Sequence, residues 1–397
     1  MNNRFFKAVA RFLLAGLVLY FLVQRADTLR ANVSQRDSIA YWTAAKLLVA
    51  HADPYDTDKV FEMEQQQGYA EQKPLVLRTP PWSLFMVVGL GVLDAFWAWV
   101  VWVAASVAGL LLAMRLCWRI YGAQRIPQNL FWIIGYLFAP VPACLVAGQM
   151  GIMLLLGLVL FLWWEVEHPY LAGAALILPF AKPHLLALFW FALIFWIVSR
   201  KKWTLAIGFL TAFALACLLP LLFDPHVFGH YREMLRRASV GLEFIPALSG
   251  VVRLLFFRRW FWVQFLPMAI GLAWCARFVA QRKSNWNWRE HAPALIVTSV
   301  LTTPYAWLTD EVIVLPAILQ AAVWIYLARK NLKVTARFAV FVFALLNLLL
   351  LLILRSKIQF ATGIYFWSSL VWFFWYVYAS SKRSQIIAFS GDVPAAR

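Results

Sequence analysis

Long apolar runs recur along almost the whole chain and leave few architectures open. Two of the longest cover residues 203–222 and 338–354. A segment of about 20 apolar residues is long enough to cross the hydrocarbon of a bilayer as a helix. Because backbone N–H and C=O groups find no water inside lipid, several such runs in one chain predict a bundle of helices. The sequence therefore predicts an all-α, polytopic membrane protein.

Composition agrees with this prediction, since 63% of the 397 residues are hydrophobic and only 14% are charged. A soluble domain is nearer half apolar and a quarter charged. Given the length that each span needs, we expect a single membrane domain over residues 1–397 with about 11 to 13 crossings. The first run follows a basic start without a clear small-x-small cleavage site, so we expect it to remain as the first helix. The runs cover residues 9–23, 82–93, 95–114, 130–139, 152–164, 170–181, 185–198, 203–222, 261–276, 292–302, 312–328, 338–354 and 360–378.

Basic residues gather in short clusters between these runs. The net charge of +18 therefore does not indicate nucleic-acid binding, because no basic patch comes with a fold that presents it. Contact with anionic membrane lipids suits some of these charges better. Short Lys/Arg-rich loops mark the cytoplasmic side, which predicts an inner (plasma) membrane protein whose other loops face the periplasm or the cell exterior. The clusters are Arg4, Lys7 and Arg11; Arg115, Arg119 and Arg125; Arg200, Lys201 and Lys202; Arg277, Arg282 and Lys283; Arg329, Lys330 and Lys333; Lys382 and Arg383.

One count conflicts with this orientation. Two full crossings by the runs 82–93 and 95–114 would put the cluster at residues 115–125 on the outside. We therefore expect one of these two runs to be re-entrant or tilted, and the sequence does not say which.

The longest polar stretch, residues 25–79, is the predicted first external loop. It holds eight of the 18 acidic residues of the chain. Within it, residues 38–50 carry apolar side chains at helical spacing but are too short and polar to span, so an interfacial helix fits. Asp37 stands at the start of this helix and Tyr41 one turn further on. A carboxylate at a membrane surface can take the proton of an attacking hydroxyl, although a helix-start residue favoured by the helix dipole explains Asp37 equally well.

Other polar residues interrupt the apolar runs. Lys182, before Pro183, lies between two of them, where an ionisable group normally faces a cavity or a partner. Its three donors suit a phosphate, and snorkelling to the interface is the alternative. Arg78 and Arg253 are external cations that would either contact a lipid phosphate or anchor the interface. Gln149, after Gly148, is a neutral donor and acceptor on what is otherwise an ordinary turn.

Adjacent carboxylates occur at Asp310 and Glu311, before a further apolar run. They would cap a helix, bind a cation or accept hydrogen bonds from sugar hydroxyls. Asp224, His226 and His230 have a spacing that allows metal ligation, but no third strong ligand adjoins them, so we assign no metal site. The sequence has no phosphate-binding loop or dinucleotide turn, requires no cofactor, and leaves dependence on a divalent metal open.

Taken in order, these pieces resemble glycosyltransferase family 87 of the GT-C superfamily, whose members are related to polyprenol-phosphate-mannose-dependent mannosyltransferases. The resemblance covers nearly the whole chain. Each motif is weak alone, and their order and spacing are more specific. The matching segments are DSIAYWTAA at 37–45, DPYD at 53–56, PP at 80–81, GQ at 148–149, AKP at 181–183, LSGVVRLL at 248–255 and TPYAWLTDEV at 303–312.

The resemblance implies a GT-C-type helix bundle and an inverting transfer of a mannose-like sugar from a polyprenyl-phosphate donor to a lipid or glycan acceptor. Asp37 would be the general base. The donor phosphate would be met by Lys182, with Arg78 or Arg253. Sugar or acceptor binding would fall to Tyr41, Gln149, Asp310 and Glu311. A transporter or flippase of lipid-linked saccharides, or a non-catalytic partner in envelope assembly, remains the alternative; the paired broken helices of many transporters do not recur here as an internal repeat.

Overall fold

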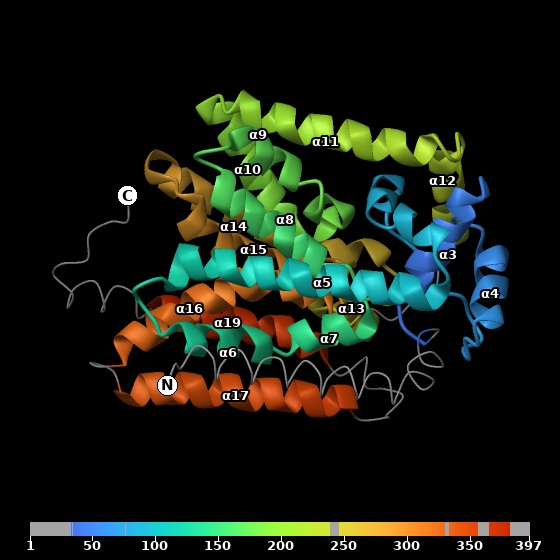
Figure 1. Ribbon diagram of the computed structural model, residues 1–397. Coiled ribbons are helices and arrows are strands. Elements are labelled where there is room, and N and C mark those ends of the chain that lie inside the picture. The colour runs from blue at the N-terminus through green and yellow to red at the C-terminus, as the bar shows by residue number, and fades with distance from the viewer. Residues whose placement is uncertain are drawn as a thin grey trace, which may run out of the picture.

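The computed structural model describes residues 33, 35–75, 77–238, 246–329, 333–355 and 365–381, and the regular structure of this part is helical (Figure 1). The predicted first helix at residues 9–23 lies outside the described residues. The helices are α3 (Ser38–Val49), α4 (Thr57–Gln66), η1 (Pro81–Met86), η2 (Val88–Val92), α5 (Ala95–Cys117), η3 (Trp118–Gly122), α6 (Gln128–Leu137), α7 (Pro140–Ala147), α8 (Gly151–Trp164), α9 (Pro169–Ala175), η4 (Pro179–Ala181), η5 (Pro183–Leu186), α10 (Ala187–Arg200), α11 (Trp203–Leu221), α12 (Val227–Arg237), α13 (Leu248–Phe256), η7 (Phe261–Phe265), α14 (Leu266–Arg282), η8 (Lys283–Asn285), α15 (Trp288–Thr302), η9 (Asp310–Val314), α16 (Leu315–Ala328), α17 (Lys333–Arg355), η10 (Tyr365–Trp367) and α19 (Ser368–Ser381).

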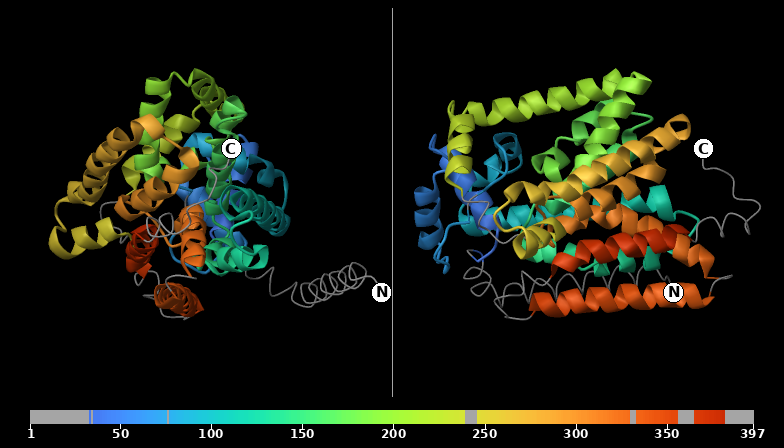
Figure 2. Two further views of the ribbon diagram at one scale, coloured as in Figure 1. Left: turned by 90° about the vertical axis from the view of Figure 1, so that its left-hand side faces the viewer. Right: turned by 180° about the vertical axis from the view of Figure 1, so that it is seen from behind.

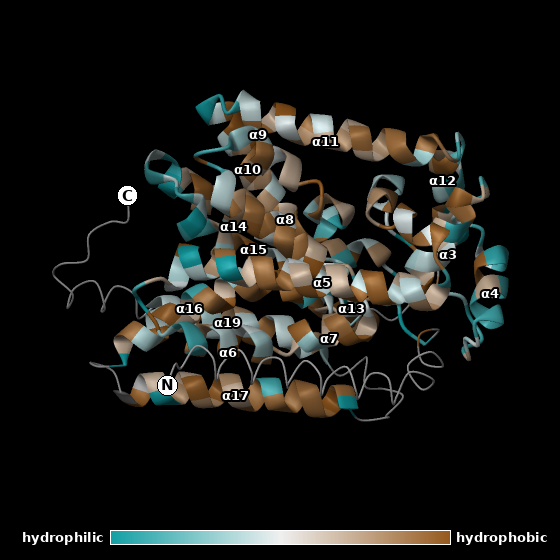
Figure 3. Ribbon diagram, in the orientation of Figure 1, coloured by the Kyte–Doolittle hydropathy of each residue, from teal (hydrophilic) through white to brown (hydrophobic). Residues whose placement is uncertain are grey.

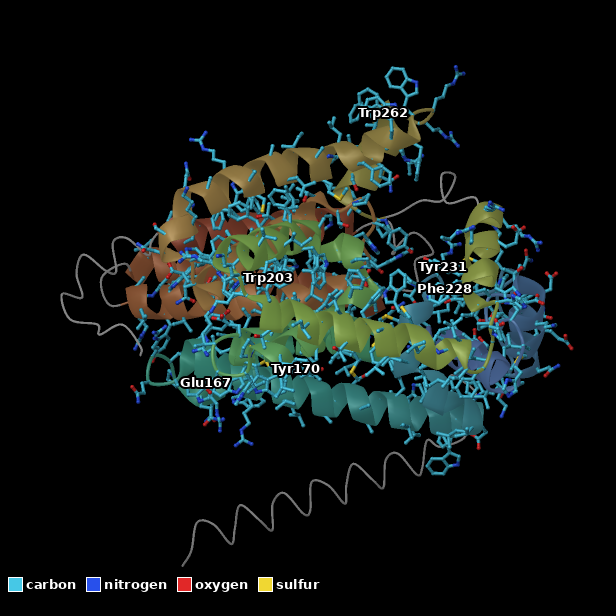
Figure 4. The ribbon with its side chains drawn as sticks, turned by 90° about the horizontal axis from the view of Figure 1, so that it is seen from above. Glu167, Tyr170, Trp203, Phe228, Tyr231 and Trp262 are labelled. Atoms are coloured by element: carbon cyan, nitrogen blue, oxygen red, sulfur yellow. The ribbon has the colours of Figure 1, made fainter. Side chains whose placement is uncertain are left out.

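The long helices run side by side between two ends of one bundle (Figures 1 and 2). Helices α3, α4 and α12 lie together at one end, which we call the α3 end. Figure 4 shows Phe228 and Tyr231 of α12 at this end, whereas Glu167, in the turn between α8 and α9, lies towards the other. Apolar residues occupy the middle of the helices and polar residues gather at the ends (Figure 3). This distribution is the one that a bilayer requires of a helix bundle.

The opposite end carries the basic loops, and we call it the basic end. Arg200, at the end of α10, donates a hydrogen bond of 3.0 Å to the carbonyl of Ser284, after α14. Arg119 and Arg289 both lie over the ring of Trp163, at 5.6 and 5.9 Å from its centroid. Loops that are far apart in the sequence therefore meet at one end, as the expected segregation of charge requires.

Among the described residues, six helices are long and apolar enough to cross a membrane, and the pair α6 and α7, bent by 57°, would make a seventh. The chain is therefore a polytopic helical membrane protein, as predicted. The number of full-length spans is lower than the expected 11 to 13, because several predicted runs form helices of only 14 or 15 residues, such as α8, α15 and α19. The six are Ala95–Gly122, Pro183–Arg200, Trp203–Leu221, Phe261–Asn285, Asp310–Ala328 and Ala336–Arg355.

The structure resolves the conflict over residues 82–114. The first run forms two short helices, η1 and η2, and does not cross, whereas α5 is a single helix of 23 residues. Helix η2 packs against α3, because Gly91 brings its backbone against the carbonyl of Ala45, where a Cβ would not fit. The indole N–H of Trp42 donates a 3.0 Å hydrogen bond to Leu93 at the end of η2. One crossing in place of two leaves Arg115 at the basic end with the other clusters, and η2 holds α3 at the opposite end.

Candidate active site

Four separate segments meet at the α3 end: the start of α3, the turn between α7 and α8, the break between η4 and η5, and the start of η9. Each contributes a polar side chain to one chain of hydrogen bonds. The members, in order, are Asp37, Gln149, Lys182 and Asp310, with Tyr41 as a second partner of Gln149. The structure thus brings together five of the residues that the sequence singled out.

The turn at Gly148 makes this meeting possible. Helix α7 ends there because Gly148 has a left-handed backbone with φ of 72°, which residues with a side chain rarely adopt. A Cβ at this position would lie 2.8 Å from Ser38, so the turn touches the first residue of α3. The indole N–H of Trp102, on α5, donates a 2.7 Å hydrogen bond to the Gly148 carbonyl. The turn is held from two sides, and Gln149 follows it in a fixed direction.

Asp37 does not behave as a helix cap. It occupies the N-cap position of α3, but its side chain accepts no hydrogen bond from the first turn. Its backbone N–H donates to Ala147 at 3.0 Å, and its Oδ2 accepts a 2.6 Å hydrogen bond from Nε2 of Gln149. Among the described residues, Gln149 makes the one side-chain hydrogen bond to this carboxylate, and Oδ1 accepts none. The helix-start explanation of Asp37 is therefore not supported by its geometry.

Burial raises the pKa of the Asp37 carboxyl above its ordinary value of 3.8, although the Gln149 hydrogen bond and the nearby Lys182 charge both lower it. Removing a carboxylate from water disfavours its charged form. A carboxylate with a raised pKa is a stronger proton acceptor than an ordinary surface aspartate.

Gln149 connects α3 to the rest of the site through both ends of its amide. Its Oε1 accepts a 2.8 Å hydrogen bond from the hydroxyl of Tyr41, and Nζ of Lys182 lies 3.5 Å from the same oxygen. The Tyr41 hydroxyl also accepts a 3.2 Å hydrogen bond from the backbone N–H of Met150. The ring of Tyr41 packs edge-on against Trp102 at 5.2 Å. These contacts fix the amide so that its N–H points at Asp37.

Lys182 and Asp310 form a buried ion pair. Nζ lies 2.6 Å from Oδ1, and the two side chains are 12% and 0% exposed. The other oxygen of Asp310 accepts a 3.0 Å hydrogen bond from the backbone N–H of Trp307. Lys182 reaches this position because Pro179 and Pro183 break the apolar run on either side of it into short helices. Its ammonium therefore lies in this buried pair and does not snorkel to the interface.

Glu311 points away from its neighbour. Its Oε1 accepts a 2.5 Å hydrogen bond from the hydroxyl of Ser368, and its Oε2 accepts a 3.1 Å hydrogen bond from the indole of Trp372. Both partners belong to α19, whereas the partner of Asp310 is Lys182, between η4 and η5. The adjacent carboxylates therefore have different environments, and Glu311 is not part of the Asp37–Asp310 chain of contacts.

The two candidate arginines flank the loop before η9. Arg78 is exposed. Burial raises the pKa of the Tyr305 hydroxyl, and the charge of Arg78 is among the effects that lower it. Arg253 is buried on α13, with its guanidinium 5.4 Å from the ring centroid of Phe261. One turn earlier on α13, Ser249 donates a 2.7 Å hydrogen bond to the carbonyl of Thr303.

Sequence reasoning missed several residues that organise this loop. Thr303 donates a 3.0 Å hydrogen bond to the carbonyl of His184, two residues after Lys182. The indole of Trp307 donates a 2.7 Å hydrogen bond to the hydroxyl of Tyr305. Their segment was singled out as a motif, but only the fold reveals that it is tied to the backbone just after Lys182 and holds Asp310, the partner of Lys182. Nothing in the apolar run 95–114 distinguishes Trp102 from the other tryptophans.

The histidines of the α12 region serve a different contact. Nδ1 of His230 lies 2.8 Å from Asp224 and 3.6 Å from Asp53, which joins α12 to the turn after α3. Among the residues that the structure describes, no group of three His, Cys, Asp or Glu side chains is placed to hold a metal ion.

The fold and the site together define a multi-pass helical membrane protein with a polar cluster at one end of its bundle. The sequence model of glycosyltransferase family 87 matches residues 79–354, which is more than half of the chain. The chain therefore belongs to glycosyltransferase family 87 and is a membrane glycosyltransferase. The match begins at Thr79, so Asp37 and Tyr41 precede the matched residues. Searches of curated proteins and of solved structures gave no match.

Proposed function

We propose that this glycosyltransferase moves a mannose-like hexose from a polyprenyl phosphate to a hydroxyl of a lipid or glycan acceptor, with inversion at the anomeric carbon. The observation that carries the proposal is the pairing of a half-buried carboxylate, Asp37, with a buried ammonium, Lys182, on one amide, Gln149. A base and a cation in one site are what a displacement with an anionic leaving group requires.

Asp37 is the proposed general base. The acceptor O–H proton goes to Asp37 Oδ1 as the oxygen forms a bond to the anomeric carbon. Gln149 holds the other oxygen of the carboxylate at 2.6 Å, so Oδ1 keeps its direction during the transfer. A positioned base of this kind contributes about 10²–10⁴-fold to the rate.

Lys182 is the proposed partner of the leaving group. As the bond between the anomeric carbon and the phosphate oxygen breaks, polyprenyl phosphate leaves with the bonding electrons. An ammonium has three N–H donors, and the contacts with Asp310 and Gln149 account for two of them. The third is available for a phosphate oxygen, while Asp310 keeps the ammonium charged and in place. Arg78, before η1, and Arg253, on α13, both lie near the loop before η9 and would meet the remaining phosphate charge.

Tyr41, Gln149 and Asp310 are the proposed contacts of the sugar or the acceptor, since each presents a hydroxyl, amide or carboxylate oxygen in the cluster. Glu311 was expected to share this task. Because Ser368 and Trp372 occupy both of its oxygens, we assign it instead to holding Asp310 in position from behind.

The proposed orientation puts the basic end in the cytoplasm and the α3 end in the periplasm or outside the cell, by the positive-inside rule. The protein would then lie in the inner (plasma) membrane as one membrane domain over residues 1–397. Residues 25–79 would form the first external loop, with α3 as an interfacial helix. A lipid-linked donor suits this side because nucleotide sugars are made in the cytoplasm, and the chain carries no nucleotide-phosphate loop.

The test compares donors with the full-length purified protein in detergent or vesicles. A polyprenyl-phosphate hexose should give product, a nucleotide hexose should not, and the product linkage should have the opposite anomeric configuration to the donor, measured by NMR. Transfer from the nucleotide sugar, or retention of configuration, would contradict the proposal while leaving the family assignment intact.

A further inference from the structure

A groove opens between helices at the basic end, far from the site described above. Its cavity of about 620 Å³ lies between α6, α16, α17 and α19. The lining is mostly apolar and includes Leu130, Ile134, Ala322, Val340, Phe341 and Trp375. A volume of this size is in the range of small-molecule and lipid-chain sites, roughly 300–1,000 Å³. Helices α6, α16 and α17 lie beside one another in this region (Figure 1).

A second, more polar cavity of about 520 Å³ adjoins the first. The two share Ile126, Tyr326 and Arg329 in their linings, so the apolar groove opens into a polar mouth. Arg125 lines the mouth and Arg337 lines the groove. Three arginines thus come from three different segments: the loop before α6, the end of α16 and the first turns of α17.

The charge at this mouth is of one sign. Among the described residues that line the two cavities there is no aspartate or glutamate. At the α3 end, by contrast, Arg236 and Arg237 pair with Glu233. Arg329 is also held in direction, since its guanidinium lies 3.3 Å from the ring centroid of Tyr326. Arginine forks of this kind are well suited to phosphate, which they bind through paired N–H donors.

The groove lies too far along the helices from Asp37 and Lys182 to be part of the transfer site. The span Asp310–Ala328 begins at the ion pair of the site and ends just before Arg329. At 1.5 Å per residue these 19 residues cover roughly 28 Å, about the thickness of the hydrocarbon core. A molecule in the groove therefore occupies the leaflet opposite to that of Asp37 and Lys182.

We propose that this groove binds an anionic glycerophospholipid of the surrounding membrane, with its phosphate at Arg125, Arg329 and Arg337 and an acyl chain in the apolar part. The three arginines favour an anionic headgroup by charge complementarity. The apolar groove beside the mouth can hold an acyl chain, which favours a lipid over a free anion. Basic pockets between membrane helices bind anionic headgroups by the same physics. The inference does not depend on which sugar or donor the enzyme uses.

The test measures lipid binding by the purified full-length protein in detergent. Phosphatidylglycerol and phosphatidylcholine with the same acyl chains are added in turn, and bound lipid is counted by native mass spectrometry and by the rise in melting temperature. The wild type should retain phosphatidylglycerol in preference. Because the double variant R125Q/R337Q removes two charge-assisted hydrogen-bond donors to the phosphate, it should lose at least about tenfold in apparent affinity. Both side chains are exposed, so this variant should fold.

Two controls separate the other occupants. Arg277→Gln removes an exposed arginine of α14 that lines neither cavity, and it should leave lipid binding unchanged. Ala322→Phe fills the apolar part and should displace the lipid. Equal retention of both lipids, unchanged binding by R125Q/R337Q, or the same stabilisation by inorganic phosphate alone would overturn the proposal. A lower melting temperature of Ala322→Phe with unchanged lipid binding would overturn it too, because the groove would then be filled by protein.

Discussion

Replacing Lys182 by methionine tests whether the ion pair at the centre of the site is buried and how much the fold depends on it. The pair is joined at 2.6 Å, with side-chain exposures of 12% and 0%. In Lys182→Met the Asp310 carboxylate would stay buried with the Trp307 N–H as its remaining described hydrogen-bond donor. Breaking a buried pair by removing one partner costs about 3–5 kcal/mol, because an uncompensated charge is left behind.

The double variant K182M/D310N removes both charges. Its amide oxygen can still accept the Trp307 hydrogen bond, so most of the lost stability should return. Lys59→Met is the matched control, since Lys59 pairs with Asp56 at 3.6 Å with exposures of 55% and 30%. An exposed pair contributes about 0–1 kcal/mol. The expected order of stability is therefore wild type and Lys59→Met first, then K182M/D310N, and Lys182→Met last.

The assay is thermal unfolding of the detergent-purified variants at one scan rate, followed by tryptophan fluorescence, with transfer activity measured in parallel. One scan rate is needed because unfolding of membrane proteins is often irreversible. Both Lys182 variants should lack turnover, since neither carries the ammonium for the leaving phosphate. A melting temperature of Lys182→Met equal to the wild type, or no recovery in K182M/D310N, would refute the buried pair. Full turnover by K182M/D310N would refute the phosphate role separately.

Three further predictions follow from local geometry. Turnover should fall at acid pH with a midpoint above 3.8, because burial raises the pKa of Asp37 and only its deprotonated form accepts the proton. A midpoint of this fall in turnover at or below pH 3.8 would contradict the prediction. Gly148→Ala should lower both the melting temperature and turnover, because a left-handed backbone disfavours a side chain by about 1–2 kcal/mol and the new Cβ would meet Ser38. Gly89→Ala is the control: the space around Gly89 is open, so this variant should lower neither. Burial raises the pKa of the Glu64 carboxyl from 4.5 to about 7, so the folded protein favours its protonated form. The stability that this protonated form contributes is fully present below pH 4.5 and is lost as the pH rises through about 7. The melting temperature should therefore fall between pH 4.5 and about 7 in the wild type, and less in Glu64→Gln.

The sequence predicted the membrane fold because hydropathy reports directly on burial in lipid. It did not predict the path of every run. Residues 82–93 are apolar enough for a crossing, but Gly89 and Gly91 lie in one short helix, η2, which packs against α3. Hydropathy counts apolar residues and does not register a backbone that stays at one end of the bundle.

The candidate site was predictable where a polar side chain interrupts an apolar run, as at Lys182 and Gln149. The pairing of Lys182 with Asp310, 128 residues later, was not, since no local pattern links residues so far apart. The division of roles between Asp310 and Glu311 was also hidden. They begin a 3₁₀ helix, in which successive side chains point about 120° apart, so adjacent carboxylates cannot both face one site.

The central claim is that Asp37 takes the proton from the acceptor, and substitution by asparagine tests it most directly. Asparagine keeps the size and can still accept the Gln149 hydrogen bond, but it is not a base. Because burial raises the pKa of the Asp37 carboxyl, a neutral side chain should be tolerated and the fold should persist. The measurement is the turnover number for transfer from a polyprenyl-phosphate hexose by the purified variant, with donor binding measured separately and Asp58→Asn, at an exposed position on α4, as the control. We predict a loss of about 10²–10⁴-fold in turnover with unchanged donor binding, and near-normal turnover by Asp58→Asn. Near-normal turnover by Asp37→Asn would contradict the account.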